Sequence, residues 1–263
     1  MIIGVAGLGT MGLGIVQTYA QAGFSVLATD ANGPARDSAL ARLAAALAPR
    51  VAKGAMTDEA RDALLARVTV IGNVDQFAPA GLIIEAIVER LDAKQALFTA
   101  LAAAAPEAVL ATNTSSIPVH QIAAGLARPE RLLGLHFFNP APVMKLVELI
   151  GPAGCDPQAL ALARQVTEAA GKTVIDAPDR PGFIVNRCAR PFYGEALALL
   201  EEGRSPGEID AAMQAAGYRL GPFALIDLIG ADINLAATEG LSAAIGGHPR
   251  YHVFAALRAQ VAE

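Results

Sequence analysis

The chain has 263 residues, a hydrophobic fraction of 54% and a formal net charge of −5. The acidic balance argues against nucleic acid as the main partner, and no apolar stretch reaches the roughly 18 residues that a membrane helix needs. The two cysteines, Cys155 and Cys188, fit neither a disulfide framework nor a metal site, so we expect two buried free thiols and no metal.

The chain opens directly into an apolar strand pattern with no basic leader, and we expect a cytoplasmic protein. Six strands are expected, at Ile2–Ala6, Ser25–Asp30, Val68–Ile71, Leu82–Ala86, Val109–Thr112 and Leu132–His136. Helices are expected between them, at Met11–Ala22, Ala35–Lys53 and Leu91–Ala105. This alternation predicts an α/β fold, a Rossmann-type, doubly wound and mostly parallel sheet. Two further strands, at Val143–Ile150 and Thr173–Ala177, are expected at one edge.

The composition changes near residues 177–182, where two prolines and a glycine mark a boundary. Beyond it only helical patterns follow, at Phe183–Gly203, at Pro206–Ala216, after Pro222 and up to Glu263. We therefore expect a dinucleotide-binding domain over residues 1–178, with a helical arm near 35–67, and a smaller all-helical domain over 179–263.

A glycine-rich turn follows the first strand and opens the first helix. It consists of Gly7, Leu8, Gly9, Thr10, Met11 and Gly12. In a Rossmann fold such glycines allow a tight turn, close approach of a pyrophosphate, and packing of the helix on the strand. Asp30 ends the second strand, where a carboxylate binds the adenosine ribose and disfavours a 2′-phosphate, so NAD is the expected cofactor. The alternative is a glycine-rich turn in an unrelated α/β protein.

His136 stands at the end of a strand, on the edge where open α/β sheets bind ligands. In the following strand, the alternation of side chains places Glu148 on an apolar face, where a carboxylate needs a partner. A neighbouring histidine is one such partner, and the pair would orient the imidazole as a general base. The alternatives for Glu148 are an ion pair with an arginine and a solvated edge strand.

Two more polar segments are candidates. Residues 112–116 carry four hydroxyls and an amide after another strand, where a hydroxyl could cap the helix that follows or bind the reacting oxygen of a substrate. Asn186 lies among apolar neighbours in the first turns of the helical domain, where its amide could bridge helices or bind a ligand.

These residues together resemble the L-3-hydroxyacyl-CoA dehydrogenases, which include bacterial 3-hydroxybutyryl-CoA dehydrogenases. The matching stretches are Gly7–Gly14, Glu85–Glu89, Asn113–Ser116, Gly134–Ile150 and Pro181–Arg187. The run Arg190–Leu197 is similar to the branch that acts on 3-hydroxyadipyl-CoA in the breakdown of aromatic acids such as phenylacetate. Family members usually carry a serine at the position of Ala46 and continue past the last helix with a segment rich in Gly, Arg and Lys.

The resemblance implies a role for each matching position. It implies His136 as the catalytic base, Glu148 as its carboxylate partner, Ser115 as the donor to the 3-oxygen and Asn186 as the amide that polarises the substrate. It implies cofactor contacts at Glu89, Lys94, Ser115 and Asn139, and a CoA phosphate contact at Lys53. From the residues alone, Arg42, Arg50 and Lys53 fall along one side of the arm helix as a basic patch.

The resemblance also implies an acyl-CoA substrate and a homodimer formed through the helical domain. The apolar run after Pro222 is too rich for one buried face, which places Leu225, Ile226 and Ile229 near the dimer interface or the domain core. Two alternative functions remain at this point. One is an NAD-dependent dehydrogenase of a free hydroxy acid or sugar acid, of the L-gulonate type, and the other is a non-catalytic NAD-binding or structural protein.

Overall fold

The computed structural model describes residues 1–262, and it divides the chain into two compact units, Met1–Asp179 and Arg180–Glu263. The last residue of the expected helical domain, Glu263, lies outside the described residues. Among the helices of residues 1–262, none combines the length and apolar character that crossing a membrane would require.

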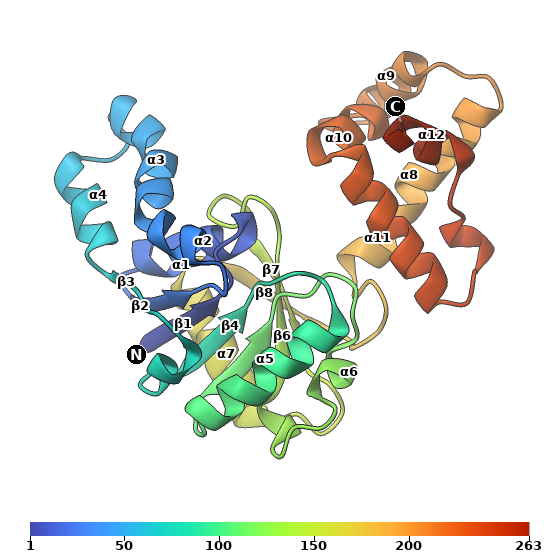
Figure 1. Cartoon of the computed structure of the whole chain (residues 1–263). Helices are drawn as coiled ribbons and strands as arrows, with labels where there is room; N and C mark the ends of the chain where they lie inside the picture. Colours follow the sequence, from blue (N-terminus) through green and yellow to red (C-terminus); the bar gives the residue numbers. More distant parts are fainter. Residues whose placement is uncertain (263) are drawn as a thin grey trace. The chain divides into compact units, whose positions relative to one another are not determined.

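The first unit is built on an eight-stranded sheet with the order β3-β2-β1-β4-β5-β6-β7-β8 (Figure 1). The strands are β1 (Ile2–Ala6), β2 (Ser25–Thr29), β3 (Val68–Val70), β4 (Leu82–Glu85), β5 (Val109–Thr112), β6 (Leu132–Phe137), β7 (Leu146–Ile150) and β8 (Thr173–Ala177). The first six run parallel, β7 runs antiparallel to β6, and β8 runs parallel to β7. The expected mostly parallel, Rossmann-type sheet is confirmed, with its two extra strands at one edge.

Helices cover both faces of this sheet. They are α1 (Thr10–Gln21), α2 (Gly33–Asp37), α3 (Ala39–Ala52), α4 (Asp58–Leu65), α5 (Leu91–Ala104), α6 (Val119–Ala123) and α7 (Pro157–Ala169). One face packs apolar strand residues such as Val5, Ile84 and Leu135 into a core with α1, α3 and α7. Because side chains alternate along a strand, the neighbouring residues belong to the opposite face, where α5 contacts β5 and α6 contacts β6.

The first part of the arm consists of two consecutive helices where one was expected. The prediction of a single helix over Ala35–Lys53 was wrong, because α2 ends at Asp37 and α3 begins at Ala39. Between them the hydroxyl of Ser38 donates to the carbonyl of Pro34 at 2.7 Å, a local bond that competes with continuous helix. Together with α4 these helices form the arm beyond β2 and β3 (Figure 1).

The second unit contains helices throughout. They are α8 (Val185–Glu201), α9 (Pro206–Ala215), α10 (Pro222–Ile229), α11 (Ala231–Ala244) and α12 (Ala255–Ala262). Tyr193, Leu197, Ile226 and Leu257 form the centre of its core. The expectation of two buried thiols was wrong, because Cys188 on α8 is exposed and Cys155 in the first unit is only half-buried.

In the turn between β1 and α1, two of the three glycines leave no room for a side chain. Gly7 has a φ of +106°, and a Cβ there would lie 2.4 Å from the carbonyl oxygen of Ala86. A Cβ on Gly12 would lie 1.9 Å from the carbonyl oxygen of Gly7, whereas one on Gly9 would meet no heavy atom within 4 Å. The helix therefore packs against the turn at Gly12, and Gly9 faces open space.

This difference predicts that one alanine substitution lowers stability and that the other has little effect. Gly12→Ala forces a backbone shift and should cost about 3 kcal/mol, a Tm lower by roughly 6 to 12 °C. Gly9→Ala should leave Tm within a few degrees. Thermal unfolding followed by circular dichroism compares the two, and equal Tm values would show that the turn yields easily at Gly12.

Candidate functional site

The candidate site lies at the carboxyl edge of the parallel strands. In the strand order, β1 and β4 are neighbours although β2 and β3 lie between them in sequence, so the connections diverge at this point. Open α/β sheets bind ligands outside the strand ends at such a switch point. The glycine turn follows β1, Asp30 follows β2, and the polar residues of β4, β5 and β6 lie along the same edge.

The glycine turn and Asp30 are tied to each other. Oδ2 of Asp30 accepts from the backbone N–H of Leu8 at 2.7 Å, and Oδ1 accepts from the N–H of Asn32 at 2.8 Å. Helix α1 has Gly9 as its N-cap and no side-chain cap, and a Cβ on Gly9 would meet no heavy atom within 4 Å. Backbone donors at a helix N-terminus, beside a carboxylate at the end of the second strand, are the arrangement in which Rossmann folds bind a dinucleotide such as NAD.

His136 and Glu148 form a buried pair on adjacent antiparallel strands. The register of β6 and β7 sets the two residues directly opposite each other, and Nδ1 of His136 lies 2.6 Å from Oε2 of Glu148. The side chain of His136 is 7% exposed and that of Glu148 is 0% exposed. Because a carboxylate only accepts, Nδ1 carries the proton, and the lone pair of the neutral ring lies at Nε2.

Glu89 organises the loop that contains Ser115. Its Oε1 accepts from the hydroxyl of Thr114 at 2.6 Å, from the backbone N–H of Ser115 at 2.9 Å, and from the N–H of Ser116 at 3.1 Å. Partial burial acts to raise the pKa of Glu89, but the nearby Lys94 ammonium and these donors outweigh it and hold the pKa below its ordinary value. The carboxylate therefore stays ionised and fixes the loop after β5.

Lys94 is buried beneath this loop. Its side chain is 1% exposed, with Nζ 2.6 Å from Oε1 of Glu85 and 3.2 Å from Oε2 of Glu89. The structure thus places Lys94, for which the resemblance implies a cofactor contact, between two carboxylates. One cation and two anions leave the cluster with one net negative charge. Removing one member of a buried pair leaves the other without compensation, so this cluster has to form as a unit.

Sequence reasoning missed several residues that build this edge. Glu85 is fully buried and accepts from the hydroxyl of Thr112 at 2.7 Å, and Oδ1 of Asn113 accepts from the N–H of Phe137 at 2.8 Å. These bonds tie the ends of β4, β5 and β6 together. A charged residue in an apolar strand was the available signal for Glu85, as it was for Glu148.

A carboxylate from the end of the first unit caps α6, the helix that follows residues 112–116. Asp179, at the end of the first unit, accepts from the backbone N–H of Val119 at 2.7 Å and from the N–H of His120 at 2.8 Å. Its carboxylate caps α6 across 60 positions of sequence. Within residues 112–116, the hydroxyl of Thr114 accepts from the backbone N–H of Ile117 at 3.0 Å, in the turn just before α6.

Lys172 holds the loop between β6 and β7. Its Nζ donates to the carbonyl of Ala141 at 2.5 Å and to the carbonyl of Met144 at 2.9 Å, and burial lowers the pKa of its ammonium. Asn139 is exposed in this loop. No sequence pattern signalled Lys172, because its role depends on a loop about 30 residues earlier.

Two expected site residues lie away from this edge or in the other unit. Lys53 is exposed and ends α3 on the arm, and Arg42 is exposed on the same helix. Arg50 donates to Oε1 of Gln21 at 2.8 Å instead of facing solvent freely. Asn186 lies in the first turn of α8, in the helical unit.

Comparison with known sequences and structures identifies the family. The sequence model of the 3-hydroxyacyl-CoA dehydrogenase NAD binding domain matches residues 2–180, and that of the 3-hydroxyacyl-CoA dehydrogenase C-terminal domain matches residues 182–261. The 3-hydroxyadipyl-CoA dehydrogenase of Escherichia coli (strain K12) is 44% identical over 239 residues, which cover 90% of this chain and 50% of that protein. A probable 3-hydroxybutyryl-CoA dehydrogenase of Bacillus subtilis (strain 168) is 39% identical over 245 residues, which cover 92% and 85%.

A solved structure supports the same family assignment. The crystal structure of 3-hydroxybutyryl-CoA dehydrogenase from Escherichia coli K12 matches with a TM-score of 0.96 and 41% identity, over 100% of this chain and 56% of that chain. The chain thus spans about half the length of the Escherichia coli relatives and most of the Bacillus subtilis relative. Because the family models match both units and the Bacillus subtilis relative is covered over most of its length, the chain belongs to the 3-hydroxyacyl-CoA dehydrogenase family.

Proposed function

We propose that this chain interconverts L-3-hydroxyacyl-CoA and 3-oxoacyl-CoA with NAD as the hydride carrier. The observation that carries the proposal is the buried pair of His136 and Glu148, 2.6 Å apart, on the sheet edge that also holds the glycine turn and Asp30. A proton-transfer group and a dinucleotide cradle on one edge are what hydride transfer at a hydroxyl-bearing carbon requires.

The glycine turn and Asp30 would hold NAD, which would supply the hydride chemistry at C3 of the acyl group. Nε2 of His136 takes the proton of the C3 hydroxyl during oxidation and gives it back to the C3 oxygen during reduction. The imidazolium formed during oxidation is stabilised by Glu148, whose carboxylate also fixes the ring through Nδ1. General acid–base action of this kind contributes about 10²- to 10⁴-fold.

Ser115 is assigned to the C3 oxygen in this proposal. Its loop is held by Glu89, whose carboxylate accepts from the Ser115 N–H at 2.9 Å. Asn186, at the start of α8, is assigned to the substrate oxygens as a polarising donor. Positioning by such residues supports the reaction because holding reactants in near-attack geometry lowers the barrier by up to roughly 7–11 kcal/mol.

The acyl carrier is assigned to the arm, where Lys53 would bind a CoA phosphate. The alternative substrate is a free hydroxy acid, which needs no cation there. The decay of NADH absorbance with acetoacetyl-CoA, compared with free acetoacetate, separates the two. Reduction of acetoacetyl-CoA supports the proposal, equal reduction of both favours the free acid, and no reduction of either favours a non-catalytic role.

We further propose a homodimer formed through the helical unit. Leu228, Ile229 and Ile233, on the adjoining helices α10 and α11, are 72%, 38% and 57% exposed. Ile226, by contrast, is 1% exposed in the core of its own unit. Apolar side chains exposed together on adjoining helices are commonly covered by a second copy.

The first functional prediction concerns the base. His136→Gln should lower kcat at least about 10²-fold, and Glu148→Gln should lower it as well because the imidazolium loses its counter-charge. Steady-state kinetics with NADH and acetoacetyl-CoA measures both. His252→Gln, which changes an exposed histidine of the helical unit, is the matched control. Near-normal turnover in His136→Gln would contradict the assignment of His136 as the general base.

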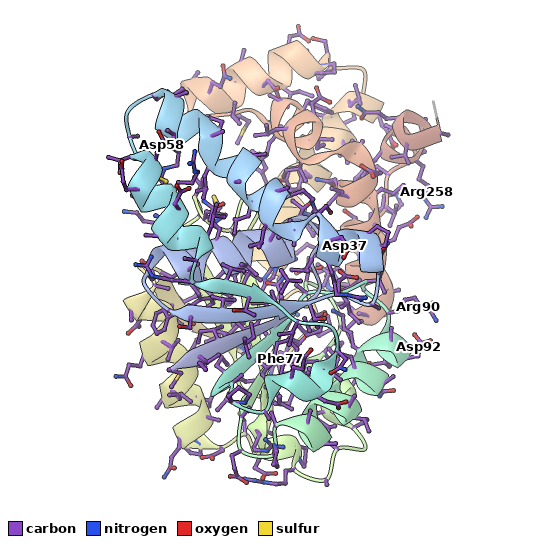
Figure 2. All side chains as sticks on the ribbon, turned by 60° about the vertical axis from the view of Figure 1, so that its left-hand side comes forward. Asp37, Asp58, Phe77, Arg90, Asp92 and Arg258 are labelled. Carbon is purple, nitrogen blue, oxygen red and sulfur yellow. The ribbon has the colours of Figure 1, made fainter. Side chains whose placement is uncertain are left out.

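A second prediction concerns the choice of cofactor. The wild-type kcat/KM should favour NADH over NADPH by about tenfold or more, because Asp30 repels the 2′-phosphate. Asp30→Asn should reduce this preference. Asp37→Asn, which neutralises an exposed carboxylate at the end of α2 (Figure 2), should not. Equal kcat/KM values for the two cofactors in the wild type would show that Asp30 does not face the ribose.

A third prediction concerns the arm. Lys53→Ala should raise KM for acetoacetyl-CoA about two- to fivefold, since an exposed ion pair contributes up to about 1 kcal/mol, and should leave KM for NADH unchanged. Arg61→Ala is the control, because Arg61 on α4 already pairs with Asp58 at 2.6 Å and Asp62 at 2.8 Å. An unchanged KM in Lys53→Ala would argue against a CoA phosphate at this position.

A further inference from the structure

The helical unit contains an open cavity whose charged side chains are all basic. Its volume is about 200 Å³, and its lining consists of Arg187, Ile245, His248, Arg250 and Tyr251. Arg187 belongs to α8, whereas the other four follow α11 along the chain. None of the residues assigned above to the dehydrogenase reaction lines this cavity. It is therefore a separate candidate site within the second unit.

The two arginines of this cavity lack a counter-charge. Arg187 is half-buried and Arg250 is exposed, and neither forms an ion pair with any of the described residues 1–262. By contrast, Arg258 on α12 pairs with Glu239 at 2.9 Å. Two positive charges that line one cavity repel each other, and an anion bound between them would replace this repulsion with attraction.

His248 adds a third donor to the cavity. Its Nδ1 accepts from the backbone N–H of Arg250 at 3.2 Å. Because the accepting nitrogen carries no proton, the neutral ring has its proton on Nε2 and donates from there. The centre of this ring lies 6.1 Å from that of Tyr251, which is 5% exposed. The cavity thus combines two guanidinium groups and an imidazole N–H beside a buried aromatic ring.

The end of α11 accounts for only part of this charge. The helix ends at Ala244, and Ile245, the next residue, lies on the cavity wall. The dipole of a helix places about half a negative charge at its C-terminus, which favours a nearby cation. Two guanidinium groups carry two positive charges, so about one and a half remain without compensation. The cavity therefore keeps a positive potential that favours an anionic ligand.

We propose that this cavity binds a phosphate group, with Arg187 and Arg250 as its charge partners and Nε2 of His248 as a further donor. A phosphate monoester carries about −1.5 to −2 charges at pH 7, which matches two guanidinium groups better than the single charge of a carboxylate does. The planar fork of arginine also fits phosphate oxygens. The volume of about 200 Å³ equals that of about six or seven water molecules, which leaves room for a phosphate and part of its hydration. Free phosphate and the ribose 3′-phosphate of CoA share this chemistry.

The test measures binding of inorganic phosphate by calorimetry, with sodium chloride holding the ionic strength constant so that screening is equal in all samples. The wild type should bind phosphate, and phosphate should raise its Tm because the ligand binds only the folded chain. Arg187→Met and Arg250→Met should each weaken binding about 10- to 100-fold, because each removes charged donors. Arg258→Met removes the same charge from an exposed side chain on α12 (Figure 2) and should leave the affinity unchanged.

A second comparison identifies the source of the phosphate. Dephospho-CoA lacks only the ribose 3′-phosphate of CoA, so a wild-type preference for CoA that Arg250→Met abolishes would assign the site to CoA. Equal binding of the two, with phosphate binding intact, would assign it to free phosphate.

Two results would overturn the site. One is a wild type that binds no phosphate at constant ionic strength. The other is an unchanged phosphate affinity in both arginine variants, which, together with a lower Tm in phosphate-free buffer, would assign the arginines to the end of α11 instead. These measurements need no turnover, so failure of the dehydrogenase proposal would leave them unaffected.

Discussion

The antiparallel pairing of β7 with β6 is the constraint on which the candidate site depends. Six strands of the sheet are parallel, and a parallel neighbour of β6 would have required another crossover. The reversal at β7 instead brings Glu148 directly opposite His136 after one short loop, on the same face of the sheet. A buried carboxylate and a buried imidazole then satisfy each other, and the loop that joins them is held by Lys172.

A second group of buried charges organises the neighbouring strand ends. Glu85, Lys94 and Glu89 connect β4, α5 and the loop after β5, and their hydrogen bonds include the backbone of Ser115. Figure 2 shows Arg90 and Asp92, at the start of α5, on the surface, where they pair with each other. Lys94, two residues later, is buried. The buried ion pair of Lys94 with Glu85 has a desolvation cost but fixes one arrangement of the loop after β5. The surface pair of Arg90 with Asp92 contributes little to stability.

The helical unit also buries a cation, but the groups around that cation are neutral. In the first unit the buried cation Lys94 meets carboxylates of its own chain. In the second, Arg190 meets an amide, a hydroxyl and an aromatic ring, all neutral. A buried charge among neutral groups keeps its desolvation cost, which an ion pair would offset in part.

The sequence by itself determined the order of strands and helices, the glycine turn with Asp30, and the residue types of the site. These are local signals, since strand alternation, glycine spacing and a charge on an apolar strand can be read from neighbouring positions. The tertiary structure decided which polar groups meet. Asp179 caps α6, Lys172 holds the loop after β6, Glu85 binds Lys94, and Arg190 is buried against Asn234. Each of these contacts joins segments that are distant in sequence or belong to different elements, and no periodicity within one element encodes its partner.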